Sequence, residues 1–173
     1  MNFKTVTIVK HPVTVVWETM QNHLAAIASD VPDIDTVTPV NSQRNEEGHL
    51  LMVNVWKAKP PLPDFLSKFV QPDMLTWTDS AVWEETKLHC RWEIQSHYFK
   101  EKMTCVGATV FEPAIGGRAC RLTFEGNLHW QPDAMPIKMA GALVTQGIES
   151  FMGGMIPANF RKLAEAVERF IQG

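Results

Sequence analysis

The residues best suited to acid–base chemistry in this sequence are a few carboxylates and histidines in its central part, and Asp79 stands first among them. A carboxyl group that points into a dry cavity has a raised pKa and can transfer a proton near neutral pH. Asp79 is an even number of residues from Trp77 and Trp83, so the three side chains share one face of a strand. We therefore name Asp79 as the one candidate catalytic residue. The alternative is that it is a turn or bulge residue.

Short motifs for other chemistries are missing. The six histidines form no HxH, HxxxH or HExxH pattern, so the sequence predicts no metal site. It contains no GxSxG elbow, glycine-rich phosphate loop or pair of catalytic carboxylates. We accordingly predict no cofactor, and we prefer a binding protein to an enzyme.

Composition narrows the classes of partner. Cys90, Cys105 and Cys120 are odd in number and form no CxxC pair, which indicates free thiols and a reducing, cytoplasmic compartment. The formal net charge of −3 provides no general positive field for a phosphate backbone, so nucleic acid is not an expected partner. No window approaches the ~20 apolar residues of a membrane span, and the first ten residues lack the pattern of a secretion signal.

Alternation of apolar and polar residues predicts an antiparallel sheet with one covered face. The pattern is clearest over residues 88–95 and 120–130. Residues 137–171 carry a broad apolar stripe at helical spacing, and Pro157 is expected to kink or divide that helix. The expected order is a strand over 3–9, a helix that begins at Pro12 and runs towards Ile27, further strands, and the long helix.

Large apolar side chains on the inward strand positions and on the helical stripe are the predicted ligand-binding residues, because pocket walls are mostly apolar. Assignment by strand parity fails beyond any β-bulge, which reverses the faces of a strand. The predicted set is Trp56, Trp77, Trp83, Trp92, Phe111, Phe124, Leu128, Met139, Leu143, Phe151 and Met155.

Two short segments carry a family resemblance. The run from Ile8 to Trp17, with its His11-Pro12 link, resembles the opening of START-like, pollen-allergen-like and polyketide-cyclase-like (SRPBCC) proteins, and Val31-Pro32-Asp33-Ile34 is similar to their entry into the second strand. The resemblance implies an α+β helix-grip fold. In it, a curved antiparallel sheet of about six to seven strands wraps around a long C-terminal helix, with two short helices after the first strand. It also implies a hydrophobic ligand, but fold alone does not decide function.

A proline-rich segment over residues 60–70 interrupts the expected sheet. Lipid-transfer members of the superfamily are similar in placing a loop or helix over the cavity mouth. The candidate lid residues, Leu62, Phe65, Leu66 and Phe69, fall on one helical face. A short helix that only fills the core is the alternative. A lid would also allow transient contact with a membrane surface.

Three functions remain open at this point. The preferred one is a single domain over residues 1–173 that holds a hydrophobic small molecule or lipid in an internal cavity, as a carrier or sensor. The second is a cyclase- or hydrolase-type enzyme that uses the same cavity. The third is a protein-interaction module, which would have a filled interior and a large exposed apolar patch. The sequence leaves the oligomeric state undecided.

Overall fold

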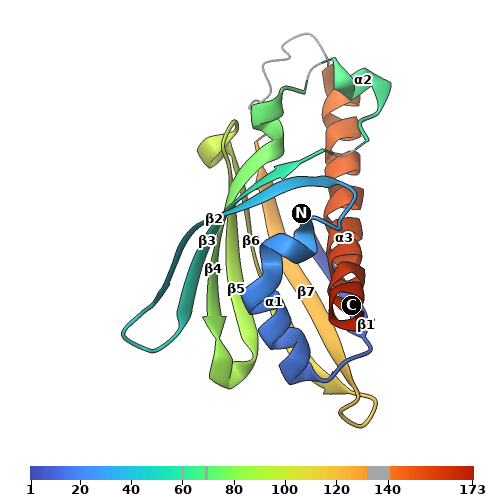
Figure 1. Cartoon of the computed structure of the whole chain (residues 1–173). Coiled ribbons are helices and arrows are strands. Elements are labelled where there is room, and N and C mark those ends of the chain that lie inside the picture. Colours follow the sequence, from blue (N-terminus) through green and yellow to red (C-terminus); the bar gives the residue numbers. More distant parts are fainter. Residues whose placement is uncertain (60, 69, 132–140) are drawn as a thin grey trace.

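Seven strands form one antiparallel sheet in the order β1-β7-β6-β5-β4-β3-β2, and helices cover its inner face (Figure 1). The computed structural model describes residues 1–59, 61–68, 70–131 and 141–173; side chains 65, 66, 72, 141–145, 147–149, 151 and 152 also lie outside the description. The elements are β1 (Asn2–Val9), α1 (Val13–Ala28), β2 (Ile34–Arg44), β3 (Leu50–Ala58), α2 (Asp64–Ser67), β4 (Thr76–Glu84), β5 (His89–Ser96), β6 (Met103–Ala114), β7 (Ala119–Trp130) and α3 (Gly141–Gln172). The predicted α+β class and helix-grip architecture are confirmed.

The long helix α3 runs alongside the sheet and packs against β1 and α1 (Figure 1). Its inward side carries buried Ala164, Ala166 and Val167, small enough to let the helix approach the layer beneath. Pro157 lies inside α3, which continues past it as one helix. Of the two effects expected at this proline, a kink or a division, the division is therefore wrong.

One helix follows the first strand, and the prediction of two short helices is wrong. α1 extends over sixteen residues, with non-helical backbone angles at His23 alone (φ −128°, ψ 20°). The segment from Val13 to Ala28 contains neither glycine nor proline, so no chain breaker separates two helices. Val16, Trp17 and Ile27 are buried on both sides of His23, and this packing holds the two halves together.

The inner face of β4 and β5 follows the alternation of the sequence. The pairings of β4 with β3 and with β5 run without a register shift. Shifts occur in β2, between Ile34 and Thr36 and between Pro39 and Asn41, at the edge of the sheet. In the central strands, every second residue therefore faces inward along the whole strand. On β4 these inward residues are Trp77, Asp79, Ala81 and Trp83.

Candidate ligand-binding cavity

A cavity of about 200 Å³ lies between the inner face of the sheet, α1 and α3. Its walls are mostly apolar and aromatic. Of the predicted ligand-binding residues, those that line it are Trp56, Trp77, Trp83, Trp92, Phe111, Phe124, Leu128 and Met155. Whether they bind a ligand remains a prediction.

The other predicted ligand-binding residues and the predicted lid residues are not placed against the cavity. Met139 and Phe69 lie outside the described residues, as do the side chains of Phe65, Leu66, Leu143 and Phe151. Leu62 is half-buried and does not line the cavity. The lid over residues 60–70 therefore stays a prediction. The helix α2, at Asp64–Ser67, spans only part of this segment.

The structure adds lining residues that the sequence interpretation missed. Met20 and Leu24 come from α1, and Asn159, Phe160 and Leu163 come from α3. Phe160 follows Ile156 by four positions on the same apolar stripe, so the helical period was a usable signal for it. Asn54 was detectable in the same way, because it shares the strand parity of Trp56.

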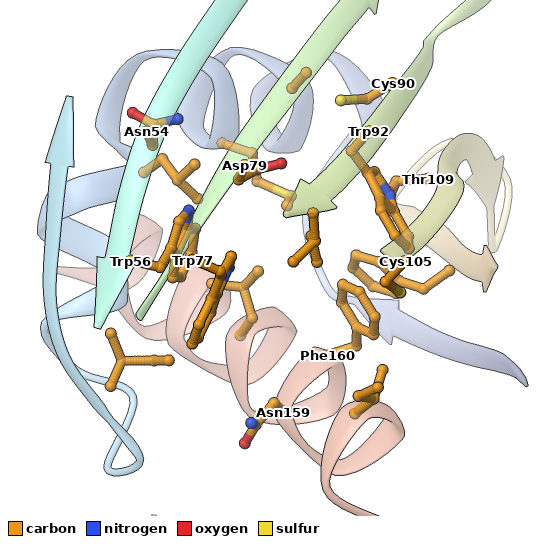
Figure 2. Close-up of a pocket in the computed structure, with 18 of the residues that line it drawn as sticks. Asn54, Trp56, Trp77, Asp79, Cys90, Trp92, Cys105, Thr109, Asn159 and Phe160 are labelled. Atoms are coloured by element: carbon orange, nitrogen blue, oxygen red, sulfur yellow. The ribbon is translucent and has the colours of Figure 1, made fainter. Parts of the chain in front are cut away.

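Aromatic rings close one side of the cavity. Phe160 stacks on Phe124 with ring centroids 4.4 Å apart and lies 5.6 Å from Trp92. The indole nitrogen of Trp92 donates a hydrogen bond of 3.1 Å to Thr109 Oγ1, which fixes the ring. On the other side of the close-up, Trp56 and Trp77 stack with centroids 6.0 Å apart (Figure 2). Such rings present flat apolar faces to a ligand.

Asn54 and Asp79 form a polar wall in this apolar surrounding. They are direct partners across the β3–β4 pairing, and Figure 2 shows them together on adjacent strands. Asn54 is only 3% exposed, and its Nδ2 has no hydrogen-bond partner. Trp83 Nε1 is likewise unpartnered, and on α3 the buried Oδ1 of Asn159 accepts no hydrogen bond.

Asp79 has a carboxyl group suited to gaining and losing a proton near neutrality. Burial raises the pKa of Asp79 from 3.8 to about 7, and the nearby indole N–H of Trp56 lowers this pKa in part. The Trp56 N–H nevertheless falls short of a full hydrogen bond. Asp79 lines the cavity. This placement agrees with the prediction from strand alternation, which put Asp79 on the same face of the strand as Trp77 and Trp83.

Two thiols also line the cavity. Burial raises the pKa of the Cys90 thiol well above 9, and the charge of Asp79 adds to the rise. Burial likewise raises the pKa of Cys105 to about 11. These thiols stay protonated at neutral pH, so they act as small apolar groups.

No family model matches the sequence, and no curated protein matches it. Solved structures do. The protein TTHA0849 from Thermus thermophilus has a TM-score of 0.67 at 14% identity, over 96% of this chain and 97% of that chain. The ZhuI aromatase/cyclase from Streptomyces sp. R1128 has a TM-score of 0.68 at 12% identity, over 99% and 93%. Ara h 8.0201 has a TM-score of 0.55 at 13% identity, over 99% and 97%.

This chain shares its helix-grip fold with these solved structures. The three matches cover nearly its whole length, so they include both the sheet and the long helix. At 12 to 14% identity the likeness describes the fold and carries no residue of a site from one chain to the other.

The described part of this helix-grip chain shows no group of three or more His, Cys, Asp or Glu side chains that could hold a metal ion. Within the same residues, no helix has the length and apolar character needed to span a membrane.

Proposed function

We propose that this protein binds a hydrophobic small molecule in the cavity between the sheet and α3, as a carrier or sensor. The observation that carries the proposal is an apolar space of about 200 Å³ inside the fold. Empty apolar space costs the protein stability, because the lining atoms lose packing contacts that a ligand would restore. Aromatic walls from several strands suit a ligand bound mainly by burial of apolar surface.

Filling the cavity tests this proposal. Ala81 lines it and is 6% exposed, so Ala81→Leu places extra side-chain volume where the ligand would lie. Ala108→Leu adds the same volume on β6 outside the cavity lining, and is the matched control. Ile94→Phe provides a second filling variant, in case the first does not fold.

The experiment is native mass spectrometry of the purified proteins, followed by organic extraction and identification of any compound released. We expect the wild type and Ala108→Leu to carry or take up an apolar compound and the filled variants to lose it. A wild type that neither carries a compound nor shifts its melting temperature with any member of a broad apolar panel contradicts the proposal.

A second candidate function is catalysis in the same cavity, favoured by the position of Asp79. Its pKa of about 7 matches the requirement of a general acid or base at neutral pH. Under this hypothesis Asp79→Asn abolishes turnover of a bound compound while its affinity stays. Equal turnover by the variant would exclude this role for Asp79.

The interaction-module alternative predicts a filled interior, and the cavity counts against it. The exposed large apolar side chains of the described residues include Val40 on β2, Val106 on β6 and Ile115 after β6. Val40 and Val106 lie on strands separated by β3, β4 and β5, and Ile115 lies beyond the end of β6, so these three positions do not form one continuous docking patch.

A further inference from the structure

Among the fully buried polar atoms of the lining residues, unpartnered donors outnumber unpartnered acceptors. On lining residues, Asn54 Nδ2 and Trp83 Nε1 have no hydrogen-bond partner, and Trp56 Nε1, which interacts with Asp79, falls short of a full hydrogen bond. The unpartnered acceptor among them is Asn159 Oδ1. A buried donor without a partner costs free energy that a ligand's acceptor can recover. The cavity is therefore better matched to a ligand that brings an acceptor than to one without polar atoms.

Charge restricts the ligand further. The described residues that line the cavity include no lysine, arginine or histidine. A carboxylate ligand would lie unpaired beside the Asp79 carboxyl, where burial and like charge both oppose it. An ammonium ligand would satisfy Asp79 but would leave the unpartnered N–H groups as they are, because it has donors only. A neutral oxygen acceptor avoids both problems.

Size and wall chemistry describe the rest of the ligand. A dry apolar cavity of roughly 150 Å³ is large enough to hold benzene. A space of about 200 Å³ lined by indole and phenyl rings therefore suits a compact molecule with one or two flat rings.

We propose that the polar wall of Asn54 and Asp79 selects a neutral one- or two-ring aromatic ligand through a carbonyl or hydroxyl oxygen, which accepts a hydrogen bond from Asn54 Nδ2. This inference rests on the proposed binding function and names the ligand class for the same cavity. Asp79 lies against the same oxygen. In its protonated form it donates a second hydrogen bond, and in its ionised form it accepts one from a ligand hydroxyl.

A matched naphthalene series tests the inference. The probes are 2-acetylnaphthalene, 2-naphthol, unsubstituted naphthalene, 2-naphthoate and 2-naphthylmethylammonium. Affinities are measured by tryptophan fluorescence, since Trp56, Trp77, Trp83 and Trp92 line the cavity, and by calorimetry. We expect the ketone and the alcohol to bind about tenfold tighter than naphthalene, which corresponds to about 1.4 kcal/mol. The carboxylate and the ammonium compound should bind more weakly than the ketone.

Asn54→Leu removes the donor and keeps the number and branching of the side-chain heavy atoms. In this variant we expect the advantage of the ketone over naphthalene to fall below about threefold. Asn41→Leu, at an exposed position of β2, is the matched control and should behave as wild type. Because Asn54 Nδ2 has no partner in the free protein, its replacement by an apolar group is compatible with folding.

The outcomes separate the inference from the proposed function. If naphthalene or the ammonium compound binds wild type as tightly as the ketone, the ligand class is wrong and the binding function stands. The same holds if Asn54→Leu keeps the full preference for the ketone. If no member of the series binds or alters the fluorescence, the ligand class is wrong, and the native mass spectrometry with the broad apolar panel decides the binding function separately. The wild-type series decides the ligand class even where the variant does not fold.

Discussion

The indole ring of Trp92 lies against Gly107 so closely that a Cβ at that glycine would be 2.4 Å from the ring. The two residues are partners in the β5–β6 pairing. Gly126 on β7 faces the same ring, with a Cβ position 2.8 Å away. The missing side chains at Gly107 and Gly126 thus make room for Trp92 to lie along the sheet and form a wall of the cavity.

Gly107→Ala should therefore destabilise the protein by about 1 to 3 kcal/mol, because the added methyl group overlaps Trp92 and the Glu125 carbonyl oxygen. Gly154 in α3 has nothing within 4 Å of its Cβ position, so Gly154→Ala should stabilise the helix by about 0.5 to 1 kcal/mol. Urea denaturation measures both. Equal effects of the two substitutions would contradict the packing argument.

Asp79 should make stability fall as pH rises. Its pKa is 3.8 when unfolded and about 7 when folded, so between these values the folded state holds more protons and loses stability with increasing pH. The loss is complete above pH 7 and amounts to a few kcal/mol. Asp79→Asn should flatten this part of the profile and be the more stable protein at pH 8. Glu93→Gln, on the exposed face of β5, is the control. A variant with an unchanged slope would contradict the burial of Asp79.

Glu84 should have the opposite effect at acid pH. Lys87 first, and then Arg91, hold the pKa of Glu84 near 2, below its usual 4.5, through contacts of 2.8 and 2.6 Å. The stabilisation is present in full above pH 4.5 and disappears as pH falls towards 2. Glu84→Gln should lower stability at pH 6 and lessen the decline towards pH 2 in a denaturation series. Glu112→Gln, whose partner Arg121 is half exposed, should change both less.

The cysteines offer a readout of cavity occupancy. Cys90 and Cys105 line the cavity, whereas Cys120 is buried outside it. All three should react slowly with N-ethylmaleimide at pH 7, because their raised pKa values leave little thiolate. A bound 2-acetylnaphthalene should slow the labelling of Cys90 and Cys105 at least several-fold and leave Cys120 unchanged, as followed by peptide mass spectrometry. Equal protection of all three would indicate general stabilisation and not occupancy.

The aromatic wall of the sheet was predictable because the central strands keep their register. Trp77, Trp83 and Trp92 were assigned to the cavity by parity, and no bulge intervenes between them in the pairings of β4. The register shifts at Pro39 and Ile34 fall on the edge strand β2, which contributes little to the cavity. The family resemblance added the packing of the sheet around the long C-terminal helix, which local sequence patterns alone do not determine.

The contribution of the helices was harder to predict. Which side of α1 meets the cavity depends on how the helix is rotated against the sheet, so Met20 and Leu24 were missed. The pairing of Asn54 with Asp79 depends on the register between β3 and β4, and a long irregular connection separates these strands. Hydrophobic patterning does not fix such a register in advance. The continuity of α1 through His23 was likewise set by tertiary packing.

The position of β1 beside β7 has a consequence for folding during synthesis. Asn2 pairs with Asn127 and Val9 with Cys120, so the first strand finds its partner only after more than a hundred residues have followed it. A ribosome-bound chain that ends before Ala119 lacks the strand beside β1, and one that ends before Gly141 lacks the helix that packs on it. Such long-range pairing slows folding and leaves strand edges exposed meanwhile. The inner face can therefore close only late, and the cavity forms after nearly the whole chain has been made.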